Sequence, residues 1–72
     1  MKIEIEYNGK KRTFLADDAN IFDQWITIGE HTEIVEETVY KNGVLQPKEK
    51  RINRDKIMFN TGLVESISMK KE

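Results

Sequence analysis

Apolar and polar residues alternate along segment 2–7, so that every second side chain falls on the same side of an extended strand. Asn8-Gly9 follows this segment, and Asn-Gly is the strongest short signal for a two-residue hairpin turn because both residues tolerate a positive φ. The pattern therefore predicts a β-hairpin of residues 2–7 and 11–16. Its register predicts two opposite pairs, one apolar and one ionic: Ile3 with Phe14, and Glu6 with Lys11.

A second Asn-Gly pair, Asn42-Gly43, predicts a second hairpin with strands over about 33–41 and 44–51. Pro47 lies in the returning strand and has no N–H for a ladder hydrogen bond, so this strand is expected at a sheet edge or broken there. A two-residue turn again predicts two opposite pairs: Tyr40 with Leu45, and Glu37 with Lys48.

The segment between the two hairpins has the features of a short helix. Asp17 or Asp18 can cap its N-terminus, and acidic residues favour a first helical turn. Apolar residues then recur at a spacing of four, which is the spacing of one helical face. We expect a helix over about 17–26 that is held by docking Phe22 and Trp25 on the sheet.

Two further strands are predicted near the C-terminus, over about 56–60 and 63–69, with a turn at Thr61-Gly62. The whole chain 1–72 then forms a single small domain, mainly β, with about five strands and one short helix. An SH3-like or otherwise partly open barrel is the first interpretation. A β-grasp arrangement is the alternative, because a hairpin followed by a helix and more strands has that order.

The amino-acid composition argues against disulfide-stabilised, zinc-stabilised and membrane-spanning proteins. A chain of 72 residues without cysteine has neither disulfides nor zinc–thiolate sites to stabilise it, so its apolar core must do so. No apolar run approaches the roughly 20 residues that span a bilayer, and we expect a cytoplasmic protein without membrane contact. Lysine and isoleucine are preferred over arginine and alanine, a bias typical of low-GC bacteria and their phages.

Candidate chemistry is sparse, and we expect no enzyme, no cofactor and no metal. The four glycines stand singly, so no phosphate-binding glycine-rich motif is present. His31 is the only histidine and is interpreted as a solvated loop residue. Segment 17–23 loosely resembles a calcium loop but lacks the loop glycine and the terminal glutamate.

Charge is segregated along the chain although the net charge is only −1. Residues 17–37 contain seven acids and no lysine or arginine, whereas residues 41–56 contain six bases and two acids. Paired strands can bring such segments together, so mutual neutralisation across a sheet is the first interpretation. If the two segments lie apart, each becomes a candidate interaction surface.

Two such surfaces are considered. The first is basic and suits phosphates, with Tyr40, Phe59 or Trp25 for stacking on a base. Its bases are Lys48, Lys50, Arg51, Arg54 and Lys56, with Lys10, Lys11 and Arg12 as further candidates. The second is acidic and suits a basic partner, with Trp25 as a candidate hot spot; it comprises Asp17, Asp18, Asp23, Glu30, Glu33, Glu36 and Glu37, all expected at the surface.

The function expected on these grounds is that of a non-enzymatic protein-binding module, an accessory or inhibitory protein of bacterial or phage origin. One alternative is a small nucleic-acid-binding barrel that uses segment 41–56, although a pI of about 5.8 is low for that class. Another is a structural domain that associates with itself through an exposed strand edge. The partner is then another protein or nucleic acid, and the chain is a monomer or a weak homo-oligomer.

Overall fold

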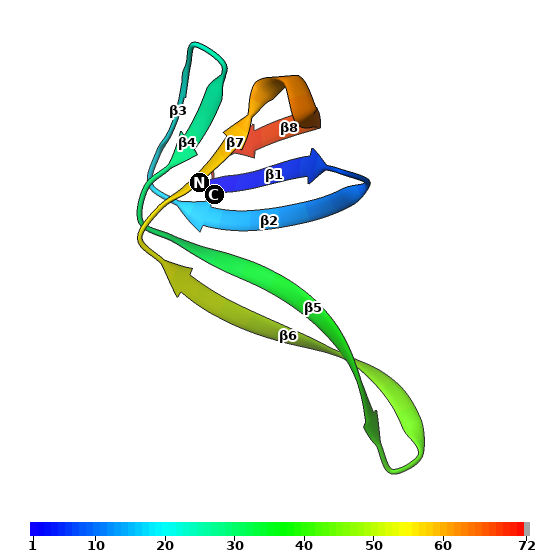
Figure 1. Ribbon diagram of the computed structural model, residues 1–72. Coiled ribbons are helices and arrows are strands. Elements are labelled where there is room, and N and C mark those ends of the chain that lie inside the picture. Colours follow the sequence, from blue (N-terminus) through cyan, green and yellow to red (C-terminus); the bar gives the residue numbers. More distant parts are fainter. Residues whose placement is uncertain (72) are drawn as a thin grey trace.

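Antiparallel strands make up most of the chain in the computed structural model, which describes residues 1–71 (Figure 1). In chain order the elements are β1 (Lys2–Tyr7), β2 (Lys10–Ala16), β3 (Ala19–Phe22), β4 (Trp25–Ile28), β5 (His31–Lys41), β6 (Val44–Arg54), β7 (Ile57–Asn60), the 3₁₀ turn η1 (Thr61–Leu63) and β8 (Val64–Lys70). They form a five-stranded sheet of order β6-β5-β2-β1-β8 and a three-stranded sheet of order β3-β4-β7.

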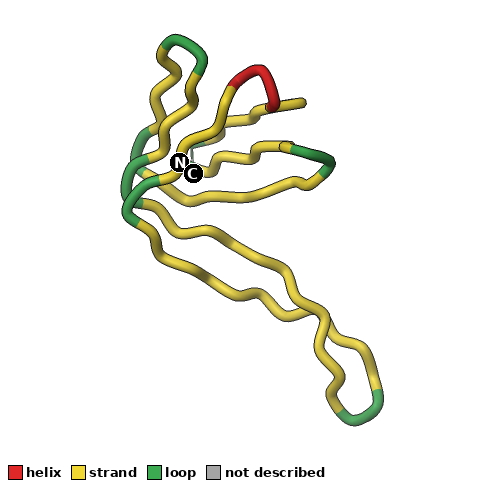
Figure 2. The backbone as a smooth tube through the Cα atoms, in the orientation of Figure 1, coloured by secondary structure: helices red, strands yellow, loops and turns green. Residues whose placement is uncertain are grey.

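The predicted class, a small mainly β domain built from hairpins, is confirmed, with eight strands where about five were expected. Within residues 1–71 the hydrogen bonds between strands divide them into two sheets and do not join these sheets into one closed barrel. The β-grasp alternative requires a helix across the sheet, and η1 is the only helical element of the described residues (Figure 2).

Both Asn-Gly hairpins form in the predicted register. Asn8 and Gly9 have φ of 53° and 75°, and Asn42 and Gly43 have φ of 54° and 77°, as a type I′ turn requires. The four predicted opposite pairs are all present: Ile3 with Phe14, Glu6 with Lys11, Tyr40 with Leu45, and Glu37 with Lys48.

One detail of the first hairpin differs from the expectation. The ammonium of Lys11 binds diagonally to Glu4, at 2.8 Å, and not to Glu6 directly opposite. Lys2 also approaches Glu4, at 3.7 Å, so this carboxylate lies between two lysines. The Lys11 hydrogen bond and the nearby positive charges lower the pKa of Glu4 below its ordinary value.

The predicted helix over 17–26 is wrong. This segment forms β3 and β4, which are joined at Asp23 and Gln24. Asp23 has a φ of 57°, a left-handed conformation that aspartate tolerates better than most residues and that reverses the chain. β-branched and aromatic residues dominate both sides of this turn and favour strands, which outweighs the capping signal before it.

The core lies between the inner faces of the two sheets. The five-stranded sheet contributes Ile3, Ile5, Phe14 and Ala16, and the three-stranded sheet contributes Ile26, Ile28 and Phe59. The Phe14 and Phe59 rings join the sheets, with their centroids 5.8 Å apart. Seven buried apolar residues make a small core, so a few further interactions must carry much of the remaining stability.

One buried carboxylate, Glu33 on β5, lies beside this core and is 5% exposed. Arg12 on β2 binds it with two hydrogen bonds, of 2.7 and 2.8 Å, and Arg54 at the end of β6 donates to it as well. The Arg12 guanidinium also lies 5.3 Å from the Phe14 ring centroid and 5.5 Å from that of Phe59. This group of three, the Glu33 clamp, joins β2, β5 and β6 and contacts both sheets.

The two arginines lower the pKa of Glu33 to about 2 from an ordinary value of 4.5, and the hydrogen bond from Arg12 contributes most. Because the pKa of Glu33 is lower in the folded state, the clamp contributes its full stabilisation at every pH above the unfolded-state pKa of 4.5. That contribution is lost as the pH falls from 4.5 through about 2.

Replacing Glu33 with glutamine removes the charge between the two arginines and leaves both without a counterion. We expect Glu33→Gln to lower the free energy of unfolding by about 2 kcal/mol at neutral pH, measured by urea denaturation. The difference from the wild type should shrink as the pH falls below 4.5, because the wild-type carboxyl is then protonated too.

Glu30→Gln is the matched control, since Glu30 is exposed and forms no ion pair with any residue of 1–71. Its effect should stay within about 0.5 kcal/mol at every pH. A Glu33→Gln effect that equals the control, or that is the same at neutral and acid pH, would show that the clamp does not stabilise the fold.

Candidate interaction surface

The β5–β6 hairpin extends far beyond the sheet to which it belongs (Figures 1 and 2). β2 pairs with β5 only from His31 to Ile34, whereas β5 and β6 remain paired up to Lys41 and Val44. The seven pairs beyond Ile34 therefore form a two-stranded ribbon, about 24 Å long at 3.4 Å per residue. A two-stranded ribbon is only marginally stable in water unless something packs on it.

Pro47 lies within β6 without interrupting it, and β6 is an edge strand, as its proline predicted. The pair next to a two-residue turn is hydrogen-bonded, and such pairs alternate with non-hydrogen-bonded ones. Pro47 lies opposite Thr38, three pairs from the Lys41 and Val44 pair, and is therefore at a non-hydrogen-bonded position. Its nitrogen faces the open edge of the sheet, so no ladder hydrogen bond is lost.

The stem of this hairpin places the acidic part of β5 directly against the basic part of β6. Glu37 lies opposite Lys48, and its carboxylate is 4.0 Å from the ammonium of Lys50. A second pair forms within β6 itself, where Glu49 accepts a hydrogen bond of 3.1 Å from Arg51. Neutralisation between paired strands, the first interpretation of the charge segregation, therefore holds for this part of the chain.

Apolar side chains replace charge at the end of the hairpin. Tyr40, Val44 and Leu45 are 75%, 57% and 56% exposed, and Tyr40 lies directly opposite Leu45. Together with Lys41, these residues are called the hairpin tip. From the sequence, Tyr40 is a candidate site residue but Val44 and Leu45 are not. The position of these two residues beside the Asn-Gly turn is the sequence signal that identifies them.

A second exposed apolar group lies on the three-stranded sheet. Phe22, Trp25 and Met58 are 82%, 44% and 46% exposed. The register places them on the side of the sheet opposite to Ile26 and Phe59, which face the core. These three residues are called the aromatic face. The expectation that Phe22 and Trp25 dock on the sheet is wrong, because as strand residues they point outward.

The structure separates the residues of the two predicted surfaces. Asp17 and Asp18 lie in the β2–β3 connection and Asp23 lies in the β3–β4 turn, whereas Glu36 and Glu37 lie in the hairpin stem. Trp25 begins β4, Tyr40 is in the hairpin tip, and Lys56 is exposed in the β6–β7 connection.

The basic residues are likewise not gathered on one face. Lys48 and Lys50 point to one side of β6 and Arg51 to the other, as the alternation of a strand dictates. Arg54 is partly buried, because its guanidinium belongs to the Glu33 clamp. Three of the six bases in segment 41–56, Lys50, Arg51 and Arg54, therefore have a carboxylate beside them.

His31 is not the solvated loop residue that was expected. It begins β5, is 5% exposed, and packs edge-on against Phe14 with ring centroids 5.3 Å apart. Its Nδ1–H donates to the carbonyl oxygen of Gly29 at 2.7 Å, because a carbonyl oxygen can only accept. Nε2 is buried and has no hydrogen-bond partner among the described residues.

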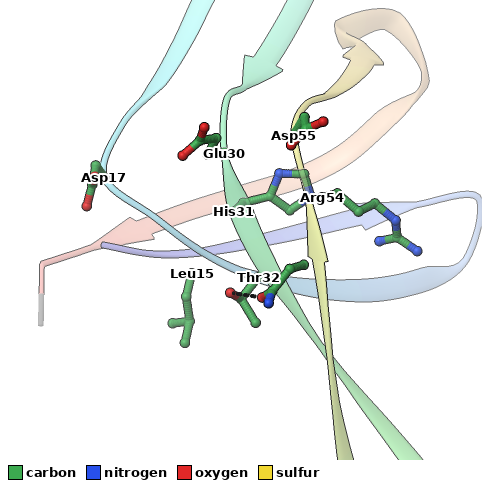
Figure 3. A pocket seen from close by; sticks show the side chains of 8 residues that line it. Leu15, Asp17, Glu30, His31, Thr32, Arg54 and Asp55 are labelled. Carbon is green, nitrogen blue, oxygen red and sulfur yellow. Dashed lines mark hydrogen bonds between the residues drawn. The ribbon is translucent and has the colours of Figure 1, made fainter.

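An open hollow of about 470 Å³ lies next to His31 at the base of the hairpin. Figure 3 shows Asp17, Glu30 and Asp55 around it, each carried by a different connection. Nε2 is shielded from solvent, so a molecule in this hollow does not reach it. Within residues 1–71, no three side chains of histidine, cysteine, aspartate or glutamate lie close enough together to hold a metal ion.

No helix in the described part of the chain is long and apolar enough to cross a membrane. Comparison with models of known protein families and with curated protein sequences gave no match. The hairpin tip and the aromatic face therefore have to be interpreted from their own chemistry.

The distal hairpin contributes no residue to the buried core, so the fold should survive without it. Replacing residues 36–49 with Asn-Gly makes Val35 and Lys50 the pair next to the new turn. This pair lies six positions from the pair next to the present turn, Lys41 and Val44. Because hydrogen-bonded pairs recur every second position, Val35 and Lys50 already have the hydrogen-bonded geometry that a two-residue turn requires. We expect the shortened protein to unfold cooperatively, with a free energy of unfolding within about 1 kcal/mol of the wild type.

Thermal and urea denaturation, together with near-ultraviolet circular dichroism of the Phe14 and Phe59 environment, measure this outcome. Loss of cooperative unfolding in the shortened protein would show that the distal hairpin takes part in folding the core.

Proposed function

We propose that this chain is a non-enzymatic protein-binding module that contacts its partner through the β5–β6 hairpin. One observation carries the proposal: the hairpin runs seven pairs beyond its sheet and ends in three large, exposed apolar side chains. A ribbon of this kind buries apolar surface only when another molecule covers it.

The anchoring of the hairpin supports this role. The Glu33 clamp holds both of its strands at their root, through Glu33 on β5 and Arg54 on β6, and ties them to Arg12 on β2. Thr32 and Asn53 add a cross-strand hydrogen bond of 2.7 Å at the same level. A hairpin held at its root loses less conformational entropy on binding than a free loop does.

The chemistry of the hairpin favours a protein over a nucleic acid. Its end is apolar, and Tyr40 offers a large, stiff side chain of the kind that is enriched at protein interfaces. The stem bases that would bind phosphates have carboxylates beside them, Glu37 next to Lys50 and Glu49 next to Arg51. The lysine and isoleucine bias favours a low-GC bacterium or phage as the source, and the proposal includes an accessory or inhibitory role in the cytoplasm of such a cell.

Capture experiments with an immobilised protein test this role. The wild type should retain a specific protein from a nuclease-treated lysate of a low-GC bacterium at low and at high salt, because apolar contacts resist screening. The shortened protein, with Asn-Gly in place of residues 36–49, should lose it. Tyr40→Ser with Leu45→Ser should weaken retention at least tenfold, since two exposed anchors are removed.

Lys50→Ala with Arg51→Ala is the matched control, because it changes the same strand without touching the hairpin tip. This variant should bind the captured protein about as well as the wild type. Equal capture by the wild type and the shortened protein would refute the proposal. Binding that needs nucleic acid, falls steeply with salt and disappears in the control variant would assign the hairpin to nucleic acid instead.

A further inference from the structure

The two exposed apolar groups lie on parts of the molecule that cannot meet. The hairpin tip ends the long β5–β6 ribbon, and the aromatic face lies on β3, β4 and β7, beyond the other side of the core (Figures 1 and 2). The molecule is 49 Å in its longest extent and 24 and 20 Å in the others. Neither group can therefore cover the other within one chain.

The two groups complement each other in chemistry. The hairpin tip presents Tyr40 and Leu45 side by side, and the aromatic face presents the flat side chains of Phe22 and Trp25. Aromatic and aliphatic side chains of this kind bury large apolar areas against one another.

Their charges complement each other too. Lys41 lies beside Val44 at the very end of the ribbon, on the other side from Tyr40 and Leu45, and Asp23 follows Phe22 in the turn of the β3–β4 hairpin. Both are exposed, and within residues 1–71 neither forms an ion pair. Among its described residues, one chain thus carries the unpaired cation of Lys41 in the hairpin tip and the unpaired anion of Asp23 beside the aromatic face.

We infer that the hairpin tip of one copy docks on the aromatic face of a second copy. This inference rests on the proposed binding role of the hairpin and names its partner as another molecule of the same chain. The contact joins two different surfaces, so each bound copy still offers an unused tip and an unused face. Association therefore continues from copy to copy, and closes into a ring or grows as a filament according to the rotation between neighbours.

The contact is small, so the copies should associate reversibly and with a clear dependence on concentration. Sedimentation velocity of the purified wild type, up to its solubility limit, should show a series of species larger than the monomer. Tyr40→Ser with Leu45→Ser removes the apolar pair of the tip, and Phe22→Ser removes the most exposed side chain of the aromatic face. Each variant alone should remain monomeric, and because all three residues are exposed, each should remain folded by circular dichroism.

A mixture of the two variants distinguishes this contact from a symmetric one. The tip variant retains its face and the Phe22→Ser variant retains its tip, so an equimolar mixture should form a one-to-one dimer and nothing larger. A symmetric contact between two tips or between two faces would let one of the variants associate by itself, and would overturn the inference.

A charge test probes the orientation of the contact. Lys41→Glu replaces the cation of the hairpin tip with a carboxylate, which repels Asp23 when the end of the ribbon docks, and should weaken association about tenfold. Asp23→Asn, which tolerates the left-handed φ at this position, should restore part of the loss when combined with Lys41→Glu. Lys56→Glu is the control: it makes the same charge change at an exposed site outside both surfaces and should have no effect.

A wild type that stays monomeric at every concentration would overturn the inference but not the proposed function, which the capture of a different protein tests separately. Association that survives loss of both the hairpin tip and Phe22 would also overturn it. If neither self-association nor hairpin-dependent capture is found, both the inference and the proposed function fail.

Discussion

The buried Glu33 carboxylate is the interaction on which the rest of this small fold depends, because it connects β2, β5 and β6. A carboxylate that is almost fully buried is stable only if cations and hydrogen bonds replace the water it has lost. Two arginines do so here, one from β2 and one from β6, and they hold the Glu33 pKa at about 2. Because Arg12 also lies over Phe14 and Phe59, the same interaction connects the edge of the five-stranded sheet with the aromatic centre of the core.

The position of the clamp explains the shape of the molecule. It lies where the pairing between β2 and β5 ends, and from that level the β5–β6 ribbon continues without support from other strands. Of residues 1–71 only seven apolar ones are buried, all of them within or next to the region where the two sheets overlap. The hairpin is thus fixed firmly at its root and makes no packing contacts at its end, which suits a structural element that reaches another molecule.

Charge and apolar surface are distributed differently over this fold. The end of the acidic segment and the basic segment lie against each other in the stem of the hairpin, where Glu37 approaches Lys50. The exposed apolar side chains, in contrast, find no cover within the molecule, as Phe22 and Tyr40 show most clearly. Apolar surface of this kind is therefore a better guide to function here than net charge or charge runs.

Local chemistry in the sequence determined the hairpins, their turns and their registers. Asn-Gly pairs select a two-residue turn, and the alternation of side chains then leaves one register that buries Ile3 and Phe14 together. It did not determine which polar residues are buried: Glu33, His31 and Arg54 were all expected at the surface, and all three lie at the core or its border. A charge can be buried only when its partner is in place, and Arg12 and Arg54 each lie 21 residues from Glu33 along the chain. Likewise, the direction in which Trp25 points depends on β4 pairing with β7, a contact between distant segments that only the tertiary structure decides.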